Sequence, residues 1–253
     1  MKDNFSVQSK SYAEFRPHYP DDMIASVVSH VQNRTTALDV ATGNGQVAVK
    51  LAAYFKSVYA TDISERQIEN AYPGQNIVYK VESAEDTDFD DDQFDLITVA
   101  QAVHWFDFEN FYREVDRILK PDGVFAVLGY GLFSTNPASD RILRHYYHNI
   151  VGRYWDAERH YVEEKYETIP FPFDEIHAEK FSATMIWSFE QLIGYLETWS
   201  ATQHYIKANG ENPIDLIRDK LSAAWENSTK QVDFPFVLRL GKLKNRKDQN
   251  LSP

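Results

Sequence analysis

A glycine-rich bend between a predicted strand and a predicted helix constrains the fold of this chain most strongly. Residues 36–51 read TALDVATGNGQVAVKL, which is an apolar run with one acidic residue, a Gly-Asn-Gly turn and then a pattern of helical period. Glycine in such a bend lets backbone amides approach a ligand that a side chain would block. The bend therefore indicates a nucleotide-like cofactor. The alternative is that Gly43 and Gly45 form an ordinary turn, because a GxG sequence alone falls short of the full GxGxxG fingerprint.

An acidic residue at the end of the next predicted strand supports the cofactor interpretation. Residues 57–63 read SVYATDI and predict a strand that ends on Asp62. This aspartate follows the glycines by about 20 residues, where dinucleotide-binding folds place an acid that accepts hydrogen bonds from the ribose. The alternative role for Asp62 is to cap the following helix, but Ser64 already supplies that cap.

Predicted strands and helices alternate through the first half of the chain, which is typical of a mostly parallel sheet flanked by helices. The second helix begins with a capping box at residues 64–67 and ends at residues 73–74, which are Pro-Gly. An amphipathic helix with Phe111 and Val115 on its apolar face precedes the last of these strands, and residues 120–123 form the turn between them. The predicted strands, rich in β-branched or aromatic residues, are 36–42, 57–63, 76–81, 94–102 and 123–129.

The second half of the chain has a different pattern, which predicts a lid over the sheet. Residues 136–166 are crowded with Tyr, His, Arg and Trp in a mainly helical pattern. Pro235 interrupts the last predicted strand and indicates a sheet edge or a bulge there. The pattern further predicts a returning strand at 182–189, helices at 190–201 and 212–227, and a strand at 231–240.

Length and apolar content predict one compact domain, because 253 residues of which 43% are apolar can bury a single core. The expected domain spans residues 1–241, and residues 242–253 are expected to be a disordered tail because they lack an apolar period. The expected parts of the domain are N-terminal cap helices (1–32), a cofactor-binding core (33–131), a lid with a returning strand (132–230) and a final strand (231–241).

Composition limits the partners and the location. A formal net charge of -12 disfavours nucleic acid, because nucleic-acid binding draws on Lys and Arg that neutralise phosphates. The chain has no cysteine for disulfides or thiolate metal sites, and its histidines lack a spacing such as HExxH, so no metal is expected. No apolar run approaches the roughly 20 residues that a membrane helix needs, and the N-terminal segment lacks the apolar region of a secretory signal. We therefore expect a cytoplasmic protein with no membrane partner.

Four separated motifs, in order, resemble the class I S-adenosylmethionine-dependent methyltransferases with a type 11 methyltransferase domain. LDVATGNG resembles the first motif of that family, TDIS its ribose-binding acid, SAEDTDFDDDQFDLI its adenine loop and fourth strand, and RILKPDGVFAVLG its following helix and fifth strand. Within that class, FSVQSKSYAEFRPHYP, QAVHWFD and YLETWSA are similar to the trans-aconitate methyltransferase group, which methylates carboxylates of small organic acids. The resemblance implies an α/β, Rossmann-like fold with a helical lid, and S-adenosyl-L-methionine as the cofactor.

The resemblance also implies the residues that bind the cofactor, with Asp39 at its methionine end, Asp62 at its ribose and Gln101 beneath its reactive sulfonium. The alternative for Glu85 is a place in a solvated acidic loop. Ala41 stands where the family has glycine, and its methyl group is expected to weaken affinity at most, provided that its backbone angles are not the positive ones that favour glycine. The expected cofactor-binding residues are Tyr12, Arg16, Asp39, Ala41, Gly43, Gly45, Asp62, Ile63, Ala84, Glu85 and Gln101.

His104 and Trp105 are the candidate catalytic residues, because they follow the fourth predicted strand at its carboxyl end, where open α/β sheets bind ligands. His104 could act as a base, whereas a carboxylate acceptor, already ionised near neutral pH, would need it only for orientation. The alternative is that Trp105 packs in the core and His104 forms a hydrogen bond at a helix start. The expected acceptor-binding residues are Tyr19, His104, Trp105 and Trp199, and composition alone adds the lid residues Arg141, Arg144, His145, Arg153 and Trp155.

Arg16 offers a planar fork for a carboxylate, which could belong to the acceptor or to the methionine end of the cofactor.

The favoured function is methyl transfer from S-adenosylmethionine to a carboxylate oxygen of a small organic acid. Two alternatives stay open. A dinucleotide-dependent oxidoreductase is disfavoured by the missing third glycine of GxGxxG, and the other alternative is a catalytically silent cofactor-binding or interaction module.

Overall fold

The computed structural model describes residues 15–226 and 228–244 and contains an eight-stranded sheet. Its strands are β1 (Thr36–Val40), β2 (Ser57–Asp62), β3 (Ile77–Val81), β4 (Phe94–Ala100), β5 (Leu119–Tyr130), β6 (Asp174–Ile176), β7 (Phe181–Ile186) and β8 (Gln231–Lys242). They lie in the order β3-β2-β1-β4-β5-β8-β6, and β7 also pairs with β8. Strands β1 to β5 are parallel, whereas β8 runs antiparallel to β5, β6 and β7. The predicted mostly parallel, Rossmann-like α/β fold is confirmed.

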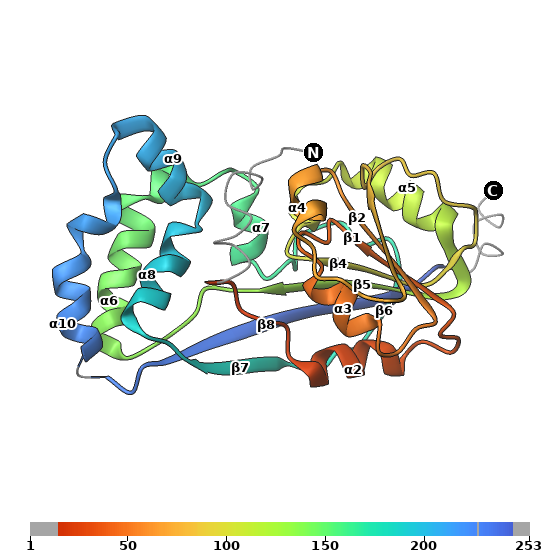
Figure 1. Cartoon of the computed structure of the whole chain (residues 1–253), viewed down its shortest axis with the longest axis horizontal. Coiled ribbons are helices and arrows are strands. Elements are labelled where there is room, and N and C mark those ends of the chain that lie inside the picture. The colour runs from red at the N-terminus through yellow and green to blue at the C-terminus, as the bar shows by residue number, and fades with distance from the viewer. Residues whose placement is uncertain (1–14, 227, 245–253) are drawn as a thin grey trace, which may run out of the picture.

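Helices cover both faces of the parallel part of the sheet (Figure 1). Successive strand residues point to opposite faces, so Ala37 packs in the core with helices α2 and α3, whereas Leu38 packs in the core with α5. The helices of this half are α2 (Asp21–Ser29), α3 (Gln46–Leu51), α4 (Glu65–Glu69) and α5 (Phe108–Ile118).

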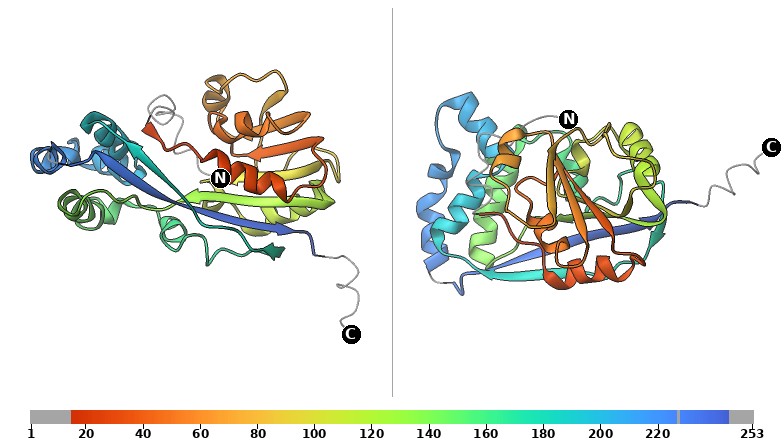
Figure 2. Two further views of the ribbon diagram at one scale, coloured as in Figure 1. Left: turned by 90° about the horizontal axis from the view of Figure 1, so that it is seen from below. Right: turned by 45° about the vertical axis from the view of Figure 1, so that its right-hand side comes forward.

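The second half of the chain forms a helical lobe beyond one end of β7 and β8, at the left of Figure 1 and in both views of Figure 2. The lobe contains α6 (Pro137–His145), α8 (Phe189–Glu197), α9 (Ser200–Asn209) and α10 (Arg218–Glu226), and α7 (Arg159–Glu163) lies between the lobe and the sheet. Aromatic rings join the lobe to β8: Phe133 lies 5.4 Å from both Tyr195 and Phe234, centroid to centroid. The predicted helical character of this segment is confirmed, and the rings hold it against the sheet.

Two predictions about strands are wrong. Residues 120–123 do not leave the sheet as a turn but form part of β5, because the register with β4 shifts between Phe94 and Leu96 and accommodates the extra residues as a bulge. Pro235 lies neither in an edge strand nor in a bulge, because β8 pairs with β7 at this residue and with β5 from Phe236 onward. The carbonyl of Pro235 accepts a hydrogen bond from the amide of Gly131, which is one residue beyond the last paired residue of β5. The pairing of β5 with β8 has ended at this point, so the N–H that proline lacks is not needed for it.

Two predictions about helices differ in detail. The predicted helix 190–201 is split into α8 and α9, because Thr198 ends the first and Trp199 has an extended backbone that caps the second. The predicted helix 212–227 begins as a short 3₁₀ turn, Pro213–Leu216, before α10. The division of the domain at residues 32, 131 and 230 stays a prediction, and most of the predicted tail lies outside the described residues, although β8 includes Lys242.

Candidate functional site

The loop after β1 requires glycine at two positions. Gly43 and Gly45 have φ of +57° and +86°, in the left-handed region that side chains disfavour. At Gly45 a Cβ would also overlap the hydroxyl of Tyr79, whereas at Gly43 nothing lies within 4 Å of where a Cβ would stand. The loop therefore turns tightly against the sheet at Gly45 and leaves open space beside Gly43.

The backbone φ of Ala41 is +51°, in the positive region that favours glycine. The condition under which its methyl group was expected only to weaken cofactor affinity is therefore not met. An alanine in the left-handed region is strained by contact between its methyl group and the backbone, at a cost of about 1 kcal/mol or more. The expectation of weakened affinity at most therefore does not apply, since the methyl group also strains the folded chain.

Asp39 is buried beneath this loop rather than in contact with open space, with 1% of its surface exposed. Its carboxylate accepts hydrogen bonds from the hydroxyls of Thr42, at 2.5 Å, and Thr98, at 2.7 Å. Burial raises the pKa of Asp39 to about 6, although these hydrogen bonds lower it in part. Asp39 thus fixes the loop from below.

Asp62 joins the two loops that follow β1 and β2. Its Oδ2 accepts from the amide of Gly43 and its Oδ1 from the amide of Ser64, both at 2.9 Å. Ser64 caps α4 with its own hydroxyl, which accepts from the amide of Gln67 at 3.4 Å. Asp62 is therefore not the cap of α4, although it holds the capping residue Ser64 in place.

A pocket of about 830 Å³ lies where β1, β2 and β4 end, and we call it the strand-end pocket. Its lining residues are Arg16, Pro17, Tyr19, Ala41, Thr42, Gly43, Asn44, Gln46, Val47, Asp62, Ile63, Ser64, Gln67, Ala100, Gln101, Ala102, Trp105 and Tyr130. Of the predicted cofactor residues, Arg16, Ala41, Gly43, Asp62, Ile63 and Gln101 line it, whereas Asp39, Gly45, Ala84 and Glu85 do not, and Tyr12 lies outside the described residues.

The strand-end pocket has the polar groups that a nucleoside cofactor needs. Asn44 Nδ2 and Gln67 Oε1, from two of its lining residues, are buried without a hydrogen-bond partner in the part of the chain that the structure describes. One is a donor and the other an acceptor, and a buried polar atom without a partner is costly. Together with the Asp62 carboxylate and the open space beside Gly43, these groups fit a hydroxylated, polar ligand.

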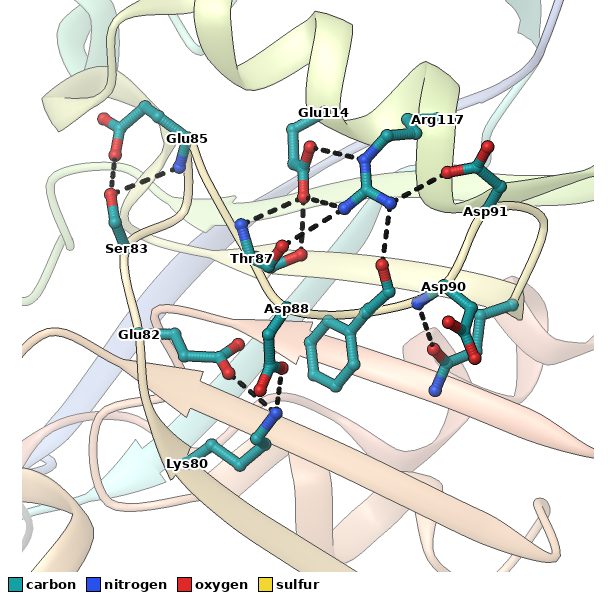
Figure 3. A network of polar contacts seen from close by, with 12 residues as sticks. Lys80, Glu82, Ser83, Glu85, Thr87, Asp88, Asp90, Asp91, Glu114 and Arg117 are labelled. Carbon is teal, nitrogen blue, oxygen red and sulfur yellow. Dashed lines mark hydrogen bonds and ion pairs between the residues drawn. The ribbon is translucent and has the colours of Figure 1, made fainter.

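The acidic loop that was expected at the adenine is held to α5 through its backbone (Figure 3), while its aspartates are exposed, as the alternative of a solvated acidic loop expects. Arg117 of α5 donates to the carbonyls of Thr87 and Phe89, at 3.2 and 2.7 Å, and pairs with Glu114 at 2.6 Å. The carboxylate of Glu114 in turn accepts from the Thr87 amide at 3.0 Å. Glu85, at the start of the loop, accepts from the Ser83 hydroxyl at 2.5 Å and lies outside the strand-end pocket.

Gln101 ends β4 with a left-handed backbone, φ +55°, and joins β4 to β5. Its side-chain oxygen accepts from the amide of Tyr130 at 2.8 Å. Arg16 reaches the same place, since its Nη1 donates to the Tyr130 hydroxyl at 3.1 Å and its Nη2 to the carbonyl of Thr198 at 2.9 Å. Arg16 therefore ties the cofactor side of the sheet to the helical lobe.

A second pocket of about 450 Å³ adjoins the first, and we call it the lid pocket. Arg16, Gln101 and Trp105 line both pockets, so the two share a wall. The other residues that line the lid pocket are His104, Trp155, Asp156, Arg159, Trp199 and Ser200. Of the predicted acceptor residues, His104, Trp105 and Trp199 therefore face this space, whereas Tyr19 lines only the strand-end pocket.

His104 is neutral in the lid pocket. It is 7% exposed, and burial together with the nearby charge of Arg159 lowers its pKa to about 3. Its Nδ1 lies 3.0 Å from the hydroxyl of Tyr166, while its Nε2 has no hydrogen-bond partner among the described residues. Nε2 is thus the nitrogen left for a ligand.

Arg159 is half-buried and held in place by aromatic rings rather than by an acid. Its Nε donates to the hydroxyl of Tyr147 at 2.8 Å, and its guanidinium lies over the ring of Trp155, 4.6 Å from the centroid. Within the described residues it forms no ion pair, in contrast with Arg117 and Arg239, which each pair with a carboxylate. Its remaining donors are available to a ligand of the lid pocket.

Several residues that line these pockets were not predicted from the sequence. Arg159, Asp156 and Tyr130 belong to no motif, and only the general richness of residues 136–166 in aromatic and charged residues pointed to the lid. Of the lid candidates chosen from composition, Trp155 lines the lid pocket, whereas Arg141, Arg144, His145 and Arg153 do not.

A Rossmann-like sheet with a polar pocket at its strand ends is typical of enzymes that bind a nucleoside cofactor. Comparisons with known proteins identify the family within this class. Residues 38–127 match the family described as the methyltransferase domain. A protein of Dictyostelium discoideum with a provisional methyltransferase name is 36% identical over 249 residues, 95% of each chain. A solved structure from Anaeromyxobacter dehalogenans, provisionally named a type II methyltransferase, has a TM-score of 0.83 and 36% identity and covers 91% of this chain and 100% of its own.

The chain belongs to the class I S-adenosylmethionine-dependent methyltransferases, and S-adenosylmethionine is its cofactor. The comparisons do not single out the trans-aconitate group. For example, the ubiquinone/menaquinone biosynthesis C-methyltransferase UbiE of Rickettsia prowazekii is 33% identical over 128 residues, which is 45% of this chain and 51% of that protein. Among the described helices, none has the length and apolar character that crossing a membrane requires.

Proposed function

We propose that this methyltransferase acts on a carboxylate oxygen of a small organic acid, with S-adenosylmethionine in the strand-end pocket and the acid in the lid pocket. The observation that supports the acceptor class is Arg159, whose guanidinium lines the lid pocket without an acidic partner among the described residues. In a chain with a net charge of -12, such an arginine beside the neutral His104 is suited to bind an anion.

The strand-end pocket would hold the cofactor mainly through Asp62 and the loop at Gly43. Each carboxylate oxygen of Asp62 accepts one backbone amide, and an ionised carboxylate has about four acceptor positions. An ionised carboxylate at this strand end is therefore suited to accept hydrogen bonds from ribose hydroxyls. Gln101 and Trp105, on the wall that both pockets share, would lie closest to the reacting groups.

S-adenosylmethionine supplies a methyl group on a cationic sulfur, and transfer would form the oxygen–carbon bond as the carbon–sulfur bond breaks, with its electron pair left on sulfur and no proton released. The chain then has no proton to remove, because a carboxylate is already ionised at neutral pH. A buried His104 with a pKa of about 3 suits this role, since it stays neutral and orients the acid by a hydrogen bond. Alignment of two reactants in such a site can lower a barrier by about 7–11 kcal/mol.

The lobe contributes to this site by excluding water. Trp155 and Trp199 line the lid pocket, and Trp199 is 3% exposed within the aromatic cluster of the lobe. A dry site strengthens the attraction between Arg159 and an anionic acceptor. Trp199 thus both packs within the lobe and lines the lid pocket.

The test is a screen of small mono- and polycarboxylic acids with S-adenosylmethionine carrying a radiolabelled methyl group. We expect labelled product with at least one acid, and release of the label as methanol in mild base, because methyl esters hydrolyse there and methyl groups on carbon or nitrogen do not. Arg159→Met should weaken the apparent affinity for the acid by at least about tenfold, since it removes a charged hydrogen-bond partner. Exposed Arg141→Met, outside the lid pocket, is the matched control. Base-stable product would contradict the proposal.

A further inference from the structure

We propose that Tyr166 is a positioning residue that donates to Nδ1 of His104 and thereby fixes the imidazole with its proton on Nε2, where it faces the acceptor. The inference depends on the proposed function only for the acceptor role of the lid pocket. A neutral imidazole has one donor and one acceptor nitrogen, so the partner of Nδ1 decides what Nε2 offers.

The contact between the two residues is buried. The Tyr166 hydroxyl lies 3.0 Å from Nδ1, the two rings are stacked with an interplanar angle of 28°, and Tyr166 and His104 are 1% and 7% exposed. A phenol hydroxyl is a stronger donor than a neutral imidazole N–H, so the phenol proton is favoured on this bond. Nε2 then carries the remaining proton toward the lid pocket, beside Arg159. Two donors side by side match an anionic ligand.

The backbone that presents Tyr166 is strained. Lys165 and Tyr166 have φ of +54° and +60°, and two consecutive left-handed residues other than glycine are unusual. Such conformations persist where the surroundings hold them. Here the Tyr166 amide donates to the carbonyl of Tyr161 at 2.7 Å, and the Tyr166 carbonyl accepts from Arg239 of β8 at 2.8 Å. The strain is thus maintained by contacts from two separate elements.

The sheet leaves room for the ring of Tyr166. A Cβ at Gly129 of β5 would lie 2.5 Å from Cε2 of Tyr166 and 3.2 Å from Oε1 of Gln101. The φ of Gly129 is not positive, so glycine is needed there for space rather than for conformation. Gly129 therefore lets the Tyr166 ring rest on the sheet next to Gln101, at the wall shared by the two pockets.

The experiment is nitrogen NMR of the full chain labelled with ¹⁵N-histidine, without acceptor, from pH 5 to 8, with the His104 signals assigned from their loss in His104→Asn. The nitrogen shifts distinguish the two neutral tautomers. We expect an excess of about tenfold or more of the form protonated on Nε2, because the other form has to donate from Nδ1 to the phenol oxygen, which is the weaker arrangement of this hydrogen bond. In Tyr166→Phe this excess should fall severalfold, while the affinity for S-adenosylhomocysteine changes less than twofold.

Tyr112→Phe is the matched control, because the Tyr112 hydroxyl is buried in the same hydrophobic cluster and has no hydrogen-bond partner within residues 15–226 and 228–244. It should leave the His104 signals unchanged. A wild-type imidazole protonated on Nδ1 would overturn the proposal even if Tyr166→Phe fails to fold, and so would a folded Tyr166→Phe with the wild-type signals. Failure of the wild-type protein to bind S-adenosylhomocysteine would count against the proposed function instead. Failure of the Tyr166 proposal and failure of the proposed function can therefore be distinguished.

Discussion

The amide of Gly43 donates to the carboxylate of Asp62 across 2.9 Å, so the residue that ends β2 holds the glycine loop that follows β1. The two loops are therefore parts of one structure, although 19 residues separate them in the sequence. A ligand that bound Asp62 would also lie against the open face of Gly43. Cofactor binding and loop order should consequently be coupled.

Ala41→Gly should stabilise the protein, because glycine adopts the φ of +51° without the strain of a methyl group. We expect the free energy of unfolding in urea to rise by about 1 kcal/mol. Ala52→Gly is the control, since Ala52 has an ordinary helical φ of -58° and glycine there should be destabilising. A loss of stability in Ala41→Gly similar to that in Ala52→Gly would refute the strain.

Asp39 should make the cofactor-free protein less stable as the pH rises from about 4 to about 6. Burial raises the folded-state pKa of Asp39 to about 6 from 3.8, so in this window the folded chain keeps a proton that the unfolded chain releases. Asp39→Asn should remove this loss. The measurement is urea unfolding of both proteins at pH 4.5 and pH 7, where the variant should gain stability over the wild type at the higher pH. A difference that does not change with pH would mean that Asp39 is ionised when buried.

His104 should make the protein less stable as the pH falls, in contrast with Asp39. Burial and Arg159 lower its folded-state pKa to about 3 from 6.5, so the unfolded chain takes up a proton first as the pH falls, and stability is lost below about pH 6.5. The stability advantage of the wild type over His104→Asn should therefore be smaller at pH 5 than at pH 8 in chemical denaturation. Equal advantages at the two values would show that the imidazole is charged in the folded protein.

Arg117→Met should destabilise the loop of residues 87–91 and the protein as a whole. The substitution removes the arginine donor from the carbonyls of Thr87 and Phe89 and from the carboxylate of Glu114, which keeps its hydrogen bonds from Thr87. The expected loss of unfolding free energy is about 1–3 kcal/mol, because the arginine is itself partly exposed. Arg113→Met, which removes one exposed hydrogen bond to Asn110 from the same helix, should change stability by less than about 0.5 kcal/mol. Thermal unfolding with and without S-adenosylhomocysteine would compare the two.

The sequence predicted the five parallel strands and several residues that line the strand-end pocket, because both depend on local signals. A glycine pair marks a tight turn and an acid at the next strand end marks the ribose position, and the structure brings Gly43 and Asp62 into contact. Residues with positive φ that are not glycine gave no such signal. Ala41, Gln101 and Tyr166 adopt left-handed conformations that their residue types disfavour, so only the folded surroundings define them.

The lid pocket could not be predicted in the same way, because its residues meet across long separations. His104 and Tyr166 are 62 residues apart, and their contact depends on how the segment after α7 crosses β5 at Gly129. Arg159 has no motif around it, and its significance lies in the absence of an acidic partner among the described residues, which no sequence pattern records. The burial that keeps His104 neutral is likewise a property of the packed lobe.

The most direct test of the account is a calorimetric titration of the purified protein with S-adenosylmethionine and S-adenosylhomocysteine, alongside Asp62→Ala and the control Glu65→Ala, an exposed acid at the start of α4. Wild type and Glu65→Ala should bind each compound with similar affinity. Asp62→Ala, folded by circular dichroism, should bind them at least about tenfold more weakly, because it loses charged hydrogen bonds to the ribose. Unchanged affinity in Asp62→Ala would contradict the placement of the cofactor in the strand-end pocket.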